Sequence, residues 1–105
     1  MELYLKTNLT IREVADKIAS RILVGFVVQA RDGLNLGGGD YFLFERDRTE
    51  VILVSNDTDH ADVFVSSRQT FPYYCYVCRG SQDILERMLD ALPSIGLEGE
   101  LGNDA

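Results

Sequence analysis

Residues 41–54 read YFLFERDRTEVILV, and they carry the clearest structural pattern in the chain. Two runs of aromatic and β-branched residues, 41–45 and 51–54, are joined by a charged turn at residues 46–49. Strand-like runs separated by a short polar turn are typical of a β-hairpin. The pattern therefore predicts two adjacent antiparallel strands in the middle of the chain.

Apolar runs on both sides of this hairpin predict further strands. Residues 22–28, ILVGFVV, are almost wholly apolar, which is the pattern of a central strand, and Gly25 within them indicates a bend or a bulge. Residues 71–77 form the last clear strand, with Pro72 at its beginning. Three shorter segments are candidates for minor or edge strands: residues 3–5, 62–65 and 97–101.

One amphipathic segment precedes these strands and another follows them. Thr10 and Glu13 have the spacing of a capping box, and the apolar residues that follow recur at helical spacing to about Ser20. Ser81 is the expected cap of a second helix that ends at Pro93. The order helix, strands, helix predicts an α+β fold, with an antiparallel sheet of about five strands and both helices packed on one face.

Length and composition fit one globular domain. The chain has 105 residues, of which 46% are hydrophobic, so we expect a single domain over residues 1–105. Its longest apolar run is far shorter than the roughly 20 residues of a membrane-spanning helix. The first residues lack the basic and apolar regions of a secretory signal. We therefore expect a cytoplasmic protein that does not contact membranes.

The charge balance restricts the possible partners. Seventeen acidic residues against ten Lys and Arg give a net charge of −7. Nucleic acid is not an expected ligand, because phosphate binding needs a basic footprint. An acidic surface attracts basic protein partners, although acidic residues also serve solubility alone.

Cys75 and Cys78 have the C-x-x-C spacing of redox and zinc sites. A redox pair normally begins a helix, and a zinc site needs a second pair of ligands. Here the pair lies in a predicted strand, where side chains three positions apart point to opposite faces. We expect one thiol to be buried and inert, and we expect neither a metal nor a cofactor.

Two further motifs invite a chemical interpretation. The glycine-rich residues 33–40 are not followed by the Lys-Ser/Thr pair and helix of a phosphate loop, so their glycines are interpreted as structural. Residues 57–62, DTDHAD, contain the single histidine, His60, but fit no calcium loop and lack a nucleophile. The sequence therefore predicts no catalytic residue, and the acidic loop is interpreted either as solvated surface or as a partner contact.

The small size, the acidity and the lack of recognisable catalytic residues resemble the immunity proteins of bacterial polymorphic toxin and contact-dependent growth inhibition systems. Residues 33–42, an apolar strand ending at Asn56, and residues 71–74 extend the resemblance over about half of the chain. The resemblance implies tight binding to a cognate toxin domain, often a basic nuclease, by a monomer or a dimer.

In that interpretation, acidic side chains occupy the phosphate site of the toxin. The first candidates for toxin binding are Asp57, Asp59 and Asp62, and the second are Glu98 and Glu100. Two other classes stay open. One is a non-toxin adaptor or regulatory binding subunit, and the other is a small hydrolase that uses His60 with a carboxylate.

Overall fold

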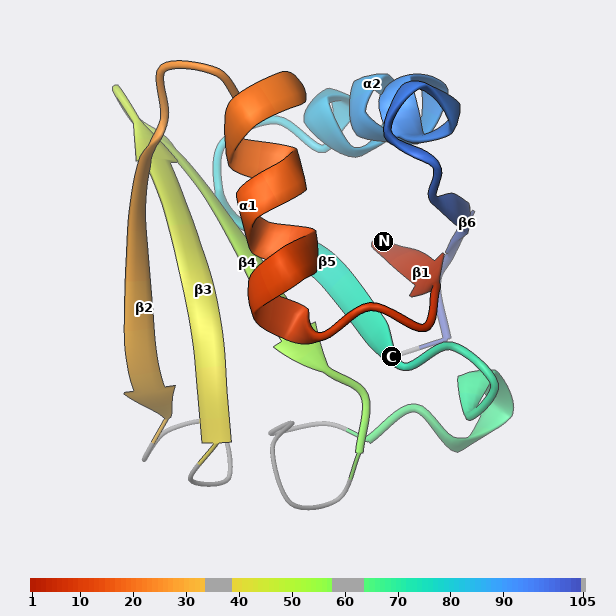
Figure 1. The fold of residues 1–105 in the computed structure, drawn as a ribbon. Coiled ribbons are helices and arrows are strands. Elements are labelled where there is room, and N and C mark those ends of the chain that lie inside the picture. Colours follow the sequence, from red (N-terminus) through yellow and green to blue (C-terminus); the bar gives the residue numbers. More distant parts are fainter. Residues whose placement is uncertain (34–38, 58–63, 105) are drawn as a thin grey trace.

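A computed structural model describes residues 1–33, 39–57 and 64–104 of the chain. Its centre is one six-stranded antiparallel sheet with the strand order β2-β3-β4-β5-β1-β6 (Figure 1). In chain order the strands are β1 (Glu2–Lys6), β2 (Val27–Gly33), β3 (Gly39–Arg46), β4 (Thr49–Ser55), β5 (Tyr73–Arg79) and β6 (Glu98–Gly102). The predicted α+β fold is confirmed, with six strands instead of about five.

The predicted hairpin is formed by β3 and β4. Tyr41 lies opposite Val54 and Phe44 lies opposite Val51, so the two apolar runs are in register. The turn contains Asp47 with a φ of 55°, in the left-handed region that short hairpin turns require and that Asp tolerates. The period of two in both strands places one set of side chains under the helices and the other on the opposite face.

Both helices pack on one face of the sheet, as predicted (Figure 1). Helix α1 (Ile11–Arg21) contacts β3 and β4, and helix α2 (Asp83–Ala91) contacts β5, β1 and β6. Their apolar stripes and the facing strands form the main core, in which Phe44, Leu53 and Cys75 are completely buried. The 3₁₀ helix η3 (Leu92–Ile95) continues α2 toward β6.

The start of α1 is the predicted one, and the start of α2 lies one residue later than predicted. The Glu13 amide donates to Thr10 Oγ1 at 3.2 Å, and the Thr10 amide donates to Glu13 Oε1 at 3.0 Å, which confirms the capping box. Helix α2 begins two residues after Ser81, so Gln82 and not Ser81 is its N-cap. The Ser81 hydroxyl still accepts the Asp83 amide at 3.2 Å and thereby satisfies one of the free N–H groups of the first turn.

Residues 22–28 do not form a central strand, and this prediction is wrong. The amides of Ile22 and Leu23 both donate to Ile18 O, at 2.9 and 2.8 Å, so the chain continues past α1 in helical turns. Gly25 then takes a φ of +88° and redirects the backbone. Strand β2 begins only at Val27, and it lies at the edge of the sheet.

A second, smaller apolar cluster lies on the face of the sheet opposite the helices. The 3₁₀ helix η2 (Ser66–Arg68) and its neighbours pack there, with Val65 buried beside Tyr4 and Tyr74. Of the short strand predicted over residues 62–65, only Phe64 and Val65 are described, and they belong to no strand. The glycines of residues 34–38 lie outside the described residues.

Candidate functional site

The acidic loop that the sequence favoured as a partner contact is described only in part. Asp57 follows β4 and is partly buried. Asp59, Asp62 and His60 lie outside the described residues. The structure therefore places one of the three first candidates, at the end of a strand in the middle of the sheet.

The second pair of candidates lies on β6, which forms one edge of the sheet. Glu98 is exposed opposite Lys6, and Glu100 lies opposite Tyr4. Glu100 forms an ion pair with Arg68, a contact that the sequence did not predict. Glu100 thus already has a partner within the chain.

Arg68 ties the C-terminal strand to η2. Its guanidinium also pairs with Asp104 and lies over the rings of Tyr4 and Phe71, at 4.8 and 5.7 Å from their centroids. Burial and a hydrogen bond to Glu2 raise the pKa of the Tyr4 phenol well above its usual value. The phenol therefore stays neutral beside this cation, and we interpret the cluster as structural.

The prediction that one cysteine of the pair is buried is confirmed. The register between β4 and β5 shifts at Cys78, which lies between the paired residues Val77 and Arg79. Cys75 is fully buried, and burial raises the pKa of its thiol to about 12. Cys78 is exposed, and both are free thiols. Among the described residues, no group of three or more His, Cys, Asp or Glu side chains could hold a metal ion.

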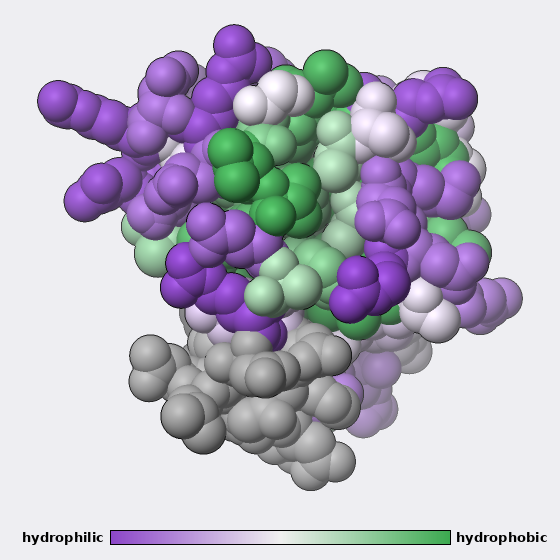
Figure 2. Space-filling view, turned by 60° about the vertical axis from the view of Figure 1, so that its left-hand side comes forward, coloured by the Kyte–Doolittle hydropathy of each residue, from purple (hydrophilic) through white to green (hydrophobic). Residues whose placement is uncertain are grey.

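The opposite edge of the sheet is apolar. We call Val24, Val27 and Val28 the apolar edge: their exposed fractions are 60%, 58% and 37%. Helix α1 packs over β3 and β4, and the helix-facing side chains of β2, Val28 and Ala30, remain exposed. Figure 2 shows apolar residues gathered on the side of the molecule that carries β2 and α1.

The two edges of the sheet therefore differ in chemistry. β6 presents Glu98 and Glu100, which is how many proteins protect an edge strand against unwanted pairing. β2 begins with the sequence Val-Val-Gln-Ala, without a charge before Arg31. The last two residues of the most apolar run, Val27 and Val28, thus leave the start of this edge without a protecting charge.

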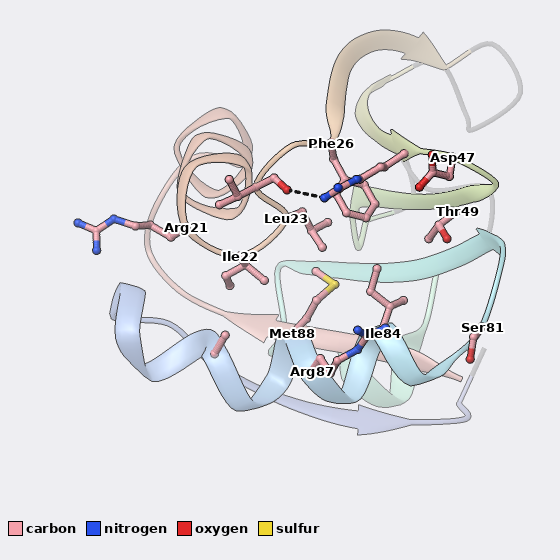
Figure 3. Close-up of a pocket in the computed structure, with 13 residues that line it drawn as sticks. Arg21, Ile22, Leu23, Phe26, Asp47, Thr49, Ser81, Ile84, Arg87 and Met88 are labelled. Carbon is pink, nitrogen blue, oxygen red and sulfur yellow. Dashed lines mark hydrogen bonds between the residues drawn. The ribbon is translucent and has the colours of Figure 1, made fainter.

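A cavity of about 380 Å³ lies beside this edge, between the end of α1, the β3–β4 turn and α2 (Figure 3). Its floor consists of side chains that are almost completely buried: Leu23, Ile84 and Met88. Phe26 lines one wall. Cavities of this size and character are typical of small-molecule sites.

Three arginines line the same cavity: Arg21, Arg46 and Arg87. Arg46 Nη1 donates to the Val24 carbonyl at 3.4 Å, the interaction dashed in Figure 3. Figure 3 shows the Arg21 side chain pointing away from the other labelled residues. No sequence pattern indicates this group, because its members come from three separate elements and share no spacing.

Comparison with protein-family models, curated proteins and solved structures finds no match to this chain. No helix in the described part of the chain has the length and apolar character needed to cross a membrane.

Proposed function

We propose that this protein works by binding another protein, as an immunity protein that neutralises a cognate basic toxin domain. The observation that carries the proposal is the apolar edge, where three valines of the most apolar run of the sequence are exposed to water. Fully burying a valine side chain stabilises by about 1.5–3 kcal/mol, so a partner that covers these side chains gains affinity.

The edge also offers hydrogen-bonding groups. An edge strand has backbone N–H and C=O groups along its outer side, and an extended segment of a partner can pair with them. Affinity then comes from the backbone, and specificity comes from the side chains that alternate along β2. The acidic residues of β6 disfavour the same pairing at the other edge.

The net charge of −7 supports a basic partner. Long-range attraction between an acidic protein and a basic domain accelerates their encounter. Asp57, Asp59 and Asp62 remain the proposed groups that attract the toxin. Glu98 is the better of the two β6 candidates, because Glu100 is engaged by Arg68.

The test compares two variants that add the same charge. Val27→Asp alters the apolar edge, and Asn103→Asp alters an exposed position in the C-terminal tail, beyond β6. Each tagged protein is incubated with lysate of the native host, and captured proteins are identified by mass spectrometry. We expect the wild type and Asn103→Asp to retain one basic protein that arrests growth when expressed alone, and Val27→Asp to lose it.

Two outcomes would overturn the proposal. Equal capture of that toxin by Val27→Asp, with circular dichroism unchanged, would exclude the apolar edge as the interface. Capture of a housekeeping complex that does not arrest growth would replace the immunity function with an adaptor function.

A further inference from the structure

We propose that the cavity between α1 and α2 binds a small anionic amphiphile, that is, a carboxylate or sulfonate on an apolar ring or chain. This site adjoins the apolar edge, because Val24 belongs to both, but the proposal does not depend on the proposed toxin interface. Its two chemical halves, an apolar floor and a cationic rim, come from different elements of the fold.

The floor is suited to an apolar body. Leu23 is 4% exposed, Ile84 7% and Met88 1%, so these side chains close the cavity from the side of the main core. The apolar surface that a ligand can cover comes mainly from the more exposed lining residues Ile22, Val24 and Phe26. Methionine adapts to ligands of different shape because its side chain is flexible and polarisable. A ring or short chain that occupies the cavity would exclude water from this surface.

The rim is suited to an anion. Arg46 comes from the end of β3, and Arg87 comes from the face of α2 that turns toward the cavity. Within the described part of the chain, neither guanidinium forms an ion pair with a carboxylate. Asp47 is the one acidic residue among the described residues that line the cavity. Cations gathered around one cavity repel each other, and a bound anion would relieve that repulsion.

Arg46 is held in place by the backbone turn at Gly25. A Cβ atom built at Gly25 would lie 3.1 Å from Arg46 Nη1, and the φ of +88° disfavours any other residue there. The guanidinium therefore packs directly over the turn while it donates to the Val24 carbonyl. Only part of its donor capacity is used, since a guanidinium has five N–H groups.

The experiment uses two dyes that share the same ring system. 8-Anilinonaphthalene-1-sulfonate carries a sulfonate, and N-phenyl-1-naphthylamine is its uncharged counterpart. Both are titrated by fluorescence into the wild type, the double variant Arg46→Gln/Arg87→Gln and the control Arg48→Gln/Arg79→Gln. The control removes the same two charges at exposed positions outside the cavity.

We expect the wild type to bind the sulfonate dye at least about tenfold more tightly than the neutral dye, as charge-assisted hydrogen bonds to two guanidinium groups would give. The cavity double variant should lose about tenfold in affinity for the sulfonate dye, and the control should lose less than about twofold. Affinity for the neutral dye should be the same in all three proteins.

Two further variants keep the test decisive. Arg87→Gln alone removes an exposed side chain that forms no hydrogen bond or ion pair with the described residues, so it should fold normally and weaken sulfonate binding. Ala91→Phe fills the cavity and should abolish the binding of both dyes. Equal sulfonate affinity in the cavity and control double variants, or full binding to Ala91→Phe, would overturn the proposal.

Discussion

Replacing Asn56 by Ala removes the side chain that fastens η2 and its flanking residues to the sheet. Asn56 is 6% exposed and follows β4. Its Nδ2 group donates to the carbonyls of Val65, Arg68 and Phe71 at 3.3, 3.1 and 3.3 Å, and its Oδ1 accepts the Val65 amide at 2.9 Å. One side chain thus binds three points of a loop.

The cost follows from these contacts. The Asn56 amide has only two N–H groups, so the three carbonyls share the equivalent of two hydrogen bonds. Each of these two bonds contributes about 1 kcal/mol net. The Val65 amide would in addition lose its buried acceptor, which costs about 1–3 kcal/mol. We therefore expect Asn56→Ala to lower the free energy of unfolding by about 3–5 kcal/mol, a large share of the 5–15 kcal/mol of a typical domain.

Urea denaturation followed by circular dichroism measures this loss. Asn103→Ala, at an exposed position, is the control and should change the free energy of unfolding by less than about 0.5 kcal/mol. Hydrogen exchange should show that the Val65 amide loses its protection in Asn56→Ala. A loss of stability below about 1 kcal/mol, with that amide still protected, would show that Asn56 does not hold this loop in place.

Three other predictions concern the cap of α1, the two thiols and the arginine of η2. Thr10→Ala should cost about 1 kcal/mol in urea denaturation. Hydrogen bonds from the Thr10 backbone amide first, and from the Thr10 hydroxyl second, lower the pKa of Glu13. The stability that they contribute is therefore present above about pH 4.5 and is lost as the pH falls through the folded-state pKa. Glu13→Gln should remove this pH dependence, whereas Thr10→Ala keeps the backbone amide and should only reduce it. Ellman's reagent should modify only Cys78 in the native protein and also Cys75 in urea, and rapid modification of both in the native state would contradict the burial of Cys75. Arg68→Gln should lower stability by about 1–2 kcal/mol through lost ion pairs and ring contacts, and the difference from the wild type should shrink in high salt.

The parts of the fold that the sequence predicts are those with local causes. The capping box fixes the start of α1 because Thr10 and Glu13 interact within one helical turn. The β3–β4 hairpin follows from two alternating runs and a short turn. The burial of one cysteine of the C-x-x-C pair follows from its place in an apolar strand.

The misplaced elements depend on contacts that are distant in the sequence. An apolar run such as residues 22–28 can enter the centre of a sheet or lie at its edge, and its composition is the same in both cases. The φ of +88° at Gly25 and the packing of α1 over β3 and β4 decide the outcome here. The sequence indicated a bend at Gly25 but not that the strand would begin after it.

The candidate sites were less predictable than the fold. The cavity gathers Arg46 and Arg87 from elements that are far apart in the chain, so no spacing indicated it. The ion pair between Arg68 and Glu100 could not be predicted for the same reason, because η2 and β6 are far apart in the chain. Charge composition indicated a basic partner, but it did not locate the surface that would meet it.

Protection of growing cells is the most direct test of the proposed function. The basic protein captured from the host is expressed in a bacterial strain together with the wild type, Val27→Asp or Asn103→Asp, and growth is followed. We expect the wild type and Asn103→Asp to restore growth and Val27→Asp, folded to the same extent, to fail to restore it. Full protection by Val27→Asp, or normal growth when the captured protein is expressed alone, would contradict it.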